Sequence, residues 1–324
     1  KIKIDELSKK IDEKGLGEII PSFVPEVYGL DEIKGALVLM LCNRRNDRKT
    51  KSIRSKSNIL IIGDPSSAKS VLGNFVIDIT PGSRKALGGS SSSVGITASV
   101  LKTEDNLGGY RVEPGALILA NDVLFLDELN NLNDEDKPKL QEGIESMCVT
   151  INKANIHISM KVTCGMLAAA NPKLGKFFTS DKPEFISEQF NIPVPILNRF
   201  DTIFTIIDVI SEESDKKIAE RMIKRHRNKL VSIYDKEFLR KFFCYIRNFK
   251  EPEINEETEE ILKKVYCLAR TNNNSSIKIN PRFLESLTRM CVASAKIRQS
   301  NKIEFKDVER CIQILAESEY KVNP

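Results

Sequence analysis

The segment at residues 59–70 constrains the fold of this chain more than any other. Residues 59–62 are four consecutive apolar residues, which is typical of a strand covered on both faces, and Gly63 follows them. A glycine here lets the backbone turn sharply, so that successive N–H groups can point at one phosphate. A helix is expected to begin near Ser67 and to aim its positive end at the same anion. The pattern predicts a phosphate-binding loop and binding of a nucleoside triphosphate.

Two side chains of this loop are expected to act on the nucleotide directly. Lys69 would reach the β- and γ-phosphates, and Ser70 would place its hydroxyl on Mg²⁺. The generic pattern has Gly before the Lys, whereas this chain has Ala68. On this segment alone, an ordinary strand-to-helix turn is therefore the alternative. The residues assigned here to nucleotide binding are Gly63, Asp64, Pro65, Ser66, Ser67, Ala68, Lys69 and Ser70.

A second apolar strand, residues 123–126, ends in the adjacent carboxylates of Asp127 and Glu128. The carboxyl ends of central strands in an α/β sheet meet at one edge, so Asp127 is expected beside the phosphate loop, where it can hold Mg²⁺. Glu128 would orient or deprotonate the attacking water. A solvated helix start is the alternative for any Asp-Glu pair, but the four apolar residues before this pair favour the catalytic interpretation.

Length and composition indicate a soluble protein of two domains. The chain has 324 residues, of which 41% are hydrophobic and 29% charged, and it contains no apolar run long enough to span a bilayer and no apolar signal segment. Its seven cysteines form no CxxC pair, so buried free thiols are expected rather than disulfides or zinc ligands. The formal net charge of +5 permits nucleic-acid binding without requiring it.

Strands and helices alternate as far as about residue 208, which predicts a parallel sheet flanked by helices. Further strands are expected at residues 166–169 and 202–207. After residue 208 only helical periodicity continues, which predicts a second, helical domain. Its helices are expected at residues 216–227, 237–248, 256–271, 281–297 and 305–319, after earlier helices at 4–14 and 31–42.

A basic segment at residues 43–58 precedes the first strand. It contains Arg44, Arg45, Arg48, Lys49, Lys51, Arg54 and Lys56, against Asp47 as its one acid. A flexible loop is expected, and a solvated connector is favoured over a DNA contact because charge runs are usually solvated.

Six motifs follow one another at residues 63–70, 93–100, 113–117, 168–172, 196–201 and 281–287. In this order they resemble the minichromosome maintenance replicative helicases, ring-forming motors of the AAA+ class, over nearly the whole chain. That family uses a phosphate loop in which Ala precedes Lys, which accounts for Ala68. The resemblance implies an α/β AAA+ P-loop NTPase with inserted β-hairpins and a smaller α-helical lid. It divides the chain into a helical lead-in (1–20), an ATPase core (21–210), and a helical linker and lid (211–324).

The resemblance also assigns roles to polar residues near the nucleotide. Asn171 matches the first sensor, which hydrogen-bonds the γ-phosphate or the attacking water, although Asn-Pro is also a common turn. Arg199 matches the arginine finger, which reaches the nucleotide of the neighbouring subunit, and the alternative is a local pair with Asp201. Arg282 matches the second sensor, also offered across the interface, and the alternative is a solvated arginine.

Val27 and Tyr28 match positions beside the adenine in that family, with a core aromatic as the alternative. Residues 99–111 resemble the family's first inserted hairpin, with Gly108-Gly109 at its turn. Residues 149–158 resemble the second hairpin, with Lys153 near its tip. In the family this lysine holds the phosphate backbone of DNA, and a solvated surface lysine is the alternative.

The chain departs from the family pattern after the acidic pair, where Leu129-Asn130-Asn131-Leu132 replaces Phe-Asp-Lys-Met. None of the departures removes a catalytic group, and together they indicate a divergent member. Residues 171–173 and 191–193 resemble archaeal members of the family more than eukaryotic ones. The chain is expected to be the motor region of a longer protein, because the family's amino-terminal DNA-binding domain and winged helix are not recognised in it.

The resemblance therefore implies an ATP-hydrolysing motor module of a DNA helicase, with ATP and Mg²⁺ as cofactors. Single-stranded or forked DNA and further copies of the chain, in a hexameric ring, are the expected partners, and no membrane is. A cytoplasmic location follows for an archaeal protein and a nuclear one for a eukaryotic protein. The alternatives are an AAA+ ATPase that remodels a protein partner and a ring subunit that binds ATP with little turnover.

Overall fold

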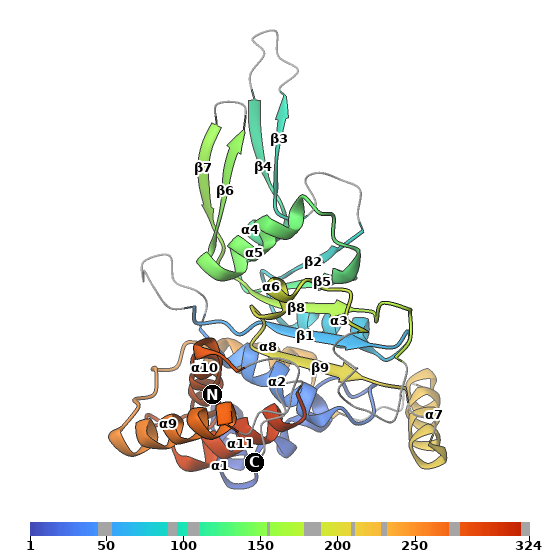
Figure 1. The fold of residues 1–324 in the computed structure, drawn as a ribbon. Helices are drawn as coiled ribbons and strands as arrows, with labels where there is room; N and C mark the ends of the chain where they lie inside the picture. The colour runs from blue at the N-terminus through green and yellow to red at the C-terminus, as the bar shows by residue number, and fades with distance from the viewer. Residues whose placement is uncertain are drawn as a thin grey trace.

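A five-stranded parallel sheet forms the centre of the ATPase core (Figure 1). The computed structural model describes residues 1–44, 54–89, 96–102, 110–153, 156–177, 189–208, 211–227, 232–271 and 279–318. In sheet order the strands are β2 (Arg84–Leu87), β5 (Val123–Asp127), β8 (Gly165–Ala170), β1 (Ile59–Gly63) and β9 (Thr202–Ile206). This arrangement confirms the predicted α/β class and every strand that was expected in the core.

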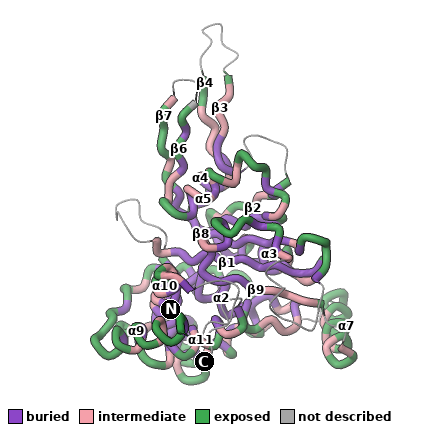
Figure 2. Tube along the Cα trace, in the orientation of Figure 1, coloured by how far each residue is buried: buried purple, intermediate pink, exposed green. Residues whose placement is uncertain are grey.

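The register of the sheet brings the carboxyl ends of its central strands to one edge. Ile62 of β1 lies opposite both Ala170 of β8 and Thr205 of β9, and Leu126 of β5 lies opposite Ala168. Strands β1, β5 and β8 are buried along their whole length (Figure 2), which explains their continuous apolar sequences. The residues that follow these strands are therefore neighbours in space.

The helices of the core pack around this sheet. They are α2 (Asp31–Cys42), α3 (Lys69–Ile79), α4 (Ala116–Leu119), α5 (Asp136–Ser146) and α6 (Val194–Leu197), together with the short 3₁₀ helices η1 (Leu16–Glu18), η2 (Ile20–Ser22) and η3 (Leu129–Asn131). Helix α3 lies close against β5 because Gly73 faces the ring of Phe125, and a Cβ there would be 2.2 Å from the ring. This contact fixes the helix that begins directly after the phosphate loop.

Two antiparallel hairpins project beyond the β2 edge of the sheet and lie side by side (Figure 1). The first consists of β3 (Ala98–Lys102) and β4 (Tyr110–Pro114), and the second of β6 (Cys148–Lys153) and β7 (Ile156–Lys161). The turns predicted at Gly108-Gly109 and at residues 154–155 lie outside the described residues. The strands themselves stand where both hairpins were expected.

The lid contains helices α8 (Lys236–Arg247), α9 (Glu256–Thr271), α10 (Pro281–Ile297) and α11 (Phe305–Ala316), whereas α7 (Glu212–His226) lies apart from them in Figure 1. Helix α1 (Ile2–Lys14), predicted as a separate lead-in, packs against this lid. Its Asp12 accepts hydrogen bonds from Arg298 at 3.0 Å and from Lys306 at 2.6 Å. The start of the chain is therefore joined to the lid by ion pairs.

Part of the predicted basic loop is buried, which corrects the expectation of a solvated connector. Lys56 is fully buried with Nζ 2.6 Å from Asp122, and burial lowers its pKa to about 8. Arg54 donates to both oxygens of Asp201, at 2.6 and 2.7 Å. The partners of both residues lie far away in sequence, so the local charge run gave no sign of them. Residues 45–53 lie outside the described part of the chain.

All seven cysteines are free. Cys42, Cys164, Cys291 and Cys311 are buried as expected, whereas Cys244 and Cys267 are exposed on lid helices. In the described part of the chain, every helix is too short or too polar to cross a bilayer.

Candidate nucleotide-binding site

The phosphate loop joins β1 to α3 in a shape that needs left-handed backbone at two residues. Ser66 has φ 67° and Ala68 has φ 62°. This conformation costs a residue with a side chain about 1–3 kcal/mol, whereas glycine adopts it freely. Ala68 thus takes the conformation in which the generic pattern places Gly. At Gly63 the limit is space, since a Cβ there would lie 2.6 Å from Ser67 Oγ.

Lys69 is buried at the centre of this loop. Its Nζ donates to the carbonyl oxygens of Gly63 and Asp64, each at 2.7 Å, and to Ser67 Oγ at 3.1 Å. Burial lowers the pKa of Lys69, while the negative charges of Asp64 and Asp127 act in the opposite direction. The loop therefore already wraps around one positive charge.

The Asp64 side chain supports the phosphate loop from within the protein and does not line the cavity described below. Its Oδ1 accepts from the backbone N–H of Phe177 at 2.7 Å, and its Oδ2 accepts from that of Asp208 at 2.9 Å. The buried carboxylate thereby ties the phosphate loop to the segments that follow β8 and β9. Gly63 does not line this cavity either, and the carbonyl oxygens of Gly63 and Asp64 accept from Lys69. The contact of both residues with a nucleotide stays a prediction.

A cavity of about 350 Å³ brings most of the predicted residues together. Three strands supply its polar walls, because the phosphate loop follows β1, the acidic pair ends β5 and Asn171 follows β8. The lining residues are Pro65, Ser66, Ser67, Ala68, Lys69, Ser70, Val71, Asp127, Glu128, Ala170 and Asn171. The cavity thus contains a cation, two carboxylates and a polar side chain at the amino end of a helix, which is an arrangement for binding a phosphorylated ligand.

The acidic pair contacts two neighbours to which sequence analysis assigned no role in the site. Lys85 of β2 places Nζ 3.4 Å from Asp127 Oδ2, and Asn131 donates to Glu128 Oε2 at 3.2 Å. Glu128 itself has a left-handed backbone with φ 56°. Gly88 passes so close that a Cβ there would lie 2.1 Å from the carbonyl oxygen of Glu128. The turn after β5 is therefore enclosed on the β2 side.

The same turn also contacts the proposed first sensor. Asn130 Oδ1 accepts a hydrogen bond from the backbone N–H of Asn171 at 3.0 Å. Asn130 and Asn131 are two of the residues at which the sequence departs from the family pattern, and each contacts a predicted catalytic residue. That departure was the signal by which sequence analysis could have found them.

Oxygen donors for Mg²⁺ border the cavity. Ser70 is exposed in the first turn of α3 and Asp127 ends β5. Mg²⁺ is usually held by one or two carboxylates together with substrate phosphates, so this donor set fits Mg²⁺ that arrives with a nucleotide. Among the described residues, no cluster of three His, Cys, Asp or Glu could hold a metal alone.

The two predicted interface arginines line a different cavity, of about 220 Å³. Arg199 follows α6, and Arg282 is the second residue of α10. Both donate to Glu145 of α5, Arg199 to Oε2 and Arg282 to Oε1, the latter at 2.5 Å. Neither arginine lines the cavity at the phosphate loop.

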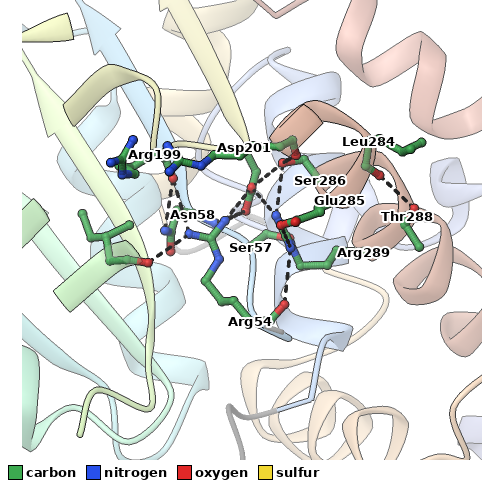
Figure 3. Close-up of polar contacts among 12 residues, drawn as sticks. Arg54, Ser57, Asn58, Arg199, Asp201, Leu284, Glu285, Ser286, Thr288 and Arg289 are labelled. Atoms are coloured by element: carbon green, nitrogen blue, oxygen red, sulfur yellow. Dashed lines mark hydrogen bonds and ion pairs between the residues drawn. The ribbon is translucent and has the colours of Figure 1, made fainter. Parts of the chain in front are cut away.

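Asp201 is occupied by other partners, as Figure 3 shows. It accepts from Arg54 of the core and from Arg289 of α10, the latter at 2.7 Å, and also from Ser286. Burial alone would raise the pKa of Asp201, but Arg289 and Arg54 together lower it. The alternative in which Arg199 pairs locally with Asp201 is therefore wrong, and Asp201 instead joins the core to the lid.

Val27 and Tyr28 lie outside the 350 Å³ cavity. The carbonyl oxygen of Val27 accepts from Lys34 at 2.7 Å and from Arg221 at 3.0 Å. The ring of Tyr28 lies below Arg221 and Lys217 of α7, at 5.3 and 5.7 Å from the ring centre. Contact of these two residues with an adenine remains a prediction.

Lys153 is the last residue of β6 and pairs with Ile156 of β7 across the hairpin. This register places its backbone at the tip end of the second hairpin, as predicted. Its side chain lies outside what the structure describes.

The sheet order, the phosphate loop after β1, the acidic pair after β5 and the helical lid define a P-loop NTPase of the AAA+ class. Comparison with family models matches residues 2–226 to the MCM P-loop domain and residues 237–319 to the MCM AAA-lid domain. The chain belongs to the minichromosome maintenance (MCM) family, which confirms the resemblance seen in its motifs.

Curated proteins with similar sequences agree with this family. Minichromosome maintenance protein MCM of Saccharolobus solfataricus is 34% identical over 304 residues, which cover 92% of this chain and 44% of that protein. DNA replication licensing factor MCM3 of Entamoeba histolytica is 29% identical over 362 residues (96% and 60%). Zygotic DNA replication licensing factor mcm6 of Xenopus tropicalis is 30% identical over 331 residues (99% and 39%). The chain thus spans between 39% and 60% of the length of these relatives.

Proposed function

We propose that this chain is the ATP-hydrolysing motor module of a ring-forming DNA helicase. The observation that carries the proposal is the division of the predicted catalytic residues between two cavities. Lys69, Asp127, Glu128 and Asn171 line one, whereas Arg199 and Arg282 line another. A site divided in this way becomes complete when the arginines of one copy meet the phosphate loop of the next.

The first cavity supplies binding and the attack of water. Lys69 would exchange its hydrogen bonds to loop carbonyls for phosphate oxygens, which carry full charge and make stronger partners. Ser70 and Asp127 would hold Mg²⁺, which when bound offsets the charge that develops on the transferred phosphoryl group. Glu128 would take the proton of the attacking water, and Asn171 would orient that water or the γ-phosphate.

The second cavity would act on the nucleotide of the neighbouring copy. Arginines supplied by another subunit stabilise the negative charge of the phosphoryl-transfer transition state, which gives hydrolysis a strong dependence on assembly. Arg199 and Arg282 are the residues proposed for this role. A closed homo-oligomeric ring, with six copies as the expected number, would place one such pair at every nucleotide.

DNA is the proposed polymer along which this motor moves. The two hairpins project side by side beyond the β2 edge of the sheet, and the second one directly precedes β8, the strand that ends at Asn171. Lys153 would contact DNA phosphates, which lets a motor hold single-stranded or forked DNA of any sequence.

Mixing two inactive variants tests the shared site. Lys69→Ala and Arg199→Ala should each lose ATPase activity, and a mixture should regain part of it at protein concentrations where a ring forms. The ATPase rate of the parental protein should increase more than proportionally with protein concentration, and addition of single-stranded DNA should increase it further. A mixture that stays inactive in a demonstrated ring would overturn the shared site, and ATPase activity indifferent to DNA would instead favour a protein-remodelling ATPase.

A further inference from the structure

Glu145 holds the two interface arginines on one carboxylate. Arg199 and Arg282 come from the segment after α6 and from the lid helix α10, and each donates to a different oxygen of Glu145. The hydrogen bond from Arg199 is the main cause of a lowered pKa for this carboxyl group, so Glu145 is charged at neutral pH. Guanidinium groups form charge-assisted hydrogen bonds with carboxylate and with phosphate oxygens, so a phosphate group is an alternative partner for both arginines.

The carboxylate of Glu145 can be displaced from the two arginines by another anion. The side chains of Glu145 and Arg282 are 39% and 43% exposed, and all three residues border the 220 Å³ cavity. One carboxylate charge also leaves two guanidinium groups with a net positive charge. A γ-phosphate, with more charge and three terminal oxygens, can therefore displace it.

Glu145 is also connected to the second hairpin. It is the penultimate residue of α5, and β6 begins three residues after it at Cys148. One helical turn earlier, Glu142 accepts from the backbone N–H of Thr150 at 3.1 Å and from its hydroxyl at 2.7 Å. The last turn of α5, which contains Glu145, and strand β6, which ends in Lys153, are therefore hydrogen-bonded to each other.

We propose that Glu145 is a positioning residue that occupies Arg199 and Arg282 until the γ-phosphate of a neighbouring subunit takes its place. The exchange would release α5 and so report the neighbour's nucleotide to the DNA-binding hairpin. This inference rests on the proposed shared site, and it adds a competitor for the arginines and a route from them to DNA.

A binding measurement that needs no hydrolysis tests the competition. A fluorescent, non-hydrolysable ATP analogue would be titrated into the protein at concentrations below and above ring formation. Glu145→Gln keeps the shape of the side chain but removes its charge, so the amide should compete less well for the arginines. The affinity of the ring for the analogue should then rise by about tenfold, which corresponds to the free energy of one charge-assisted hydrogen bond. Below ring formation the affinity should match the parental protein. Glu145→Asp should stay near the parental affinity in both regimes.

A double-variant cycle ties the effect to the arginine. In an Arg199→Ala background, Glu145→Gln should change analogue affinity by less than twofold, because the arginine for which Glu145 competes is absent. Glu285→Gln is the matched control, since Glu285 borders the same cavity but pairs with Arg289 instead. A gain in affinity that persists without Arg199, or that occurs equally in Glu285→Gln, would overturn the role of Glu145.

The link to DNA has its own readout. Linkage requires that DNA and nucleotide strengthen each other's binding by the same factor, and both Glu145→Gln and Thr150→Val should reduce that factor toward one. If the parental protein binds the analogue equally at all protein concentrations, the shared site itself fails. If parental binding tightens on assembly but Glu145→Gln leaves affinity and linkage unchanged, only the inference about Glu145 fails.

Discussion

The side-chain oxygen of Asn130 accepts a hydrogen bond from the backbone N–H of Asn171 at 3.0 Å. This bond joins the turn that follows Glu128 to the end of β8, so the proposed base and the proposed sensor are held by one contact. Asn130 stands where the family pattern has Asp, and a carboxylate oxygen could accept the same bond.

Asn130→Ala should therefore damage turnover more than binding. The substitution leaves the Asn171 N–H without an acceptor, at a cost of about 1–2 kcal/mol in the placement of the sensor. We expect kcat for ATP to fall about tenfold while nucleotide Kd changes less than twofold. Asn130→Asp should keep kcat near the parental value, and Asn133→Ala, an exposed neighbour, should have no effect. If Asn130→Ala and the parental protein have equal kcat, the hydrogen bond between Asn130 and Asn171 does not contribute to turnover.

Lys69→Ala and Glu128→Gln should separate binding from hydrolysis. Lys69 would contact phosphate in the ground state, so its removal should abolish measurable nucleotide binding. Glu128→Gln should bind nucleotide normally and hydrolyse it at least about a hundredfold more slowly, since a general base is removed. Lys264→Ala and Glu257→Gln on α9 are controls of matched charge. Parental turnover in Glu128→Gln would mean that another group activates the water.

Ala68→Gly should be neutral or stabilising, although glycine usually weakens a protein. The φ of 62° at Ala68 costs an alanine about 1–2 kcal/mol that glycine does not incur. Thermal unfolding should show a midpoint at or above the parental one, whereas the control Ala295→Gly, inside α10, should lower it. Ala68→Val should lose nucleotide affinity, because a β-branched residue resists this conformation. A clear loss of stability in Ala68→Gly would contradict strain at this position.

Lys34 should make stability depend on pH in the alkaline range. Burial lowers its pKa to about 8 from an ordinary value of 10.5. Between these two values the unfolded chain binds a proton that the folded protein does not, so the contribution of Lys34 to stability rises with pH. Lys34→Met removes this dependence, and Val27 keeps Arg221 as a donor to its carbonyl.

The free energy of unfolding of the parental protein, minus that of Lys34→Met, should thus increase by an amount on the order of 2 kcal/mol between pH 8 and pH 10.5. Denaturant titrations at a series of pH values would measure it, with Lys264→Met as an exposed control that shows no such trend. A constant difference across this range would mean that Lys34 titrates normally.

Lys153→Ala should affect DNA more than chemistry. If Lys153 of each copy in a ring binds one phosphate, the slope of log K for single-stranded DNA against log salt should flatten by about 0.7 for every phosphate that is no longer bound. Basal ATP hydrolysis should persist, and its stimulation by DNA should fall. Lys264→Ala tests whether removal of any lysine has this effect. An unchanged slope with normal stimulation would return Lys153 to an ordinary surface charge.

The sheet and the phosphate site could be predicted because their signals are local. Continuous apolar residues at 59–62 and 123–126 mark strands buried on both faces, and the polar residues that follow them meet wherever such strands are parallel and adjacent. Strand β2 was missed, because it is largely exposed and begins with the charged residues Arg84 and Lys85, which interrupt any apolar run.

The contacts between distant segments could not be predicted in the same way. Arg54 and Asp201 are 147 residues apart in the sequence, so nothing near either one shows that they pair. The bridge from Glu145 to Arg282 spans 137 residues and depends on where the lid lies. For this reason the basic segment at residues 43–58 was expected to be solvated, although Arg54 and Lys56 near its end form ion pairs and Lys56 is buried.

The packing of α1 on the lid has a consequence for how the chain folds. Lys306 of α11 donates to Asp12 of α1, which lies 294 residues away in the sequence. The parallel sheet of the ATPase core lies between these two contacting segments in the sequence. The hydrogen bonds of Asp12 to Arg298 and Lys306 can therefore form only after the residues between them have been synthesised, and contacts of this sequence separation slow folding.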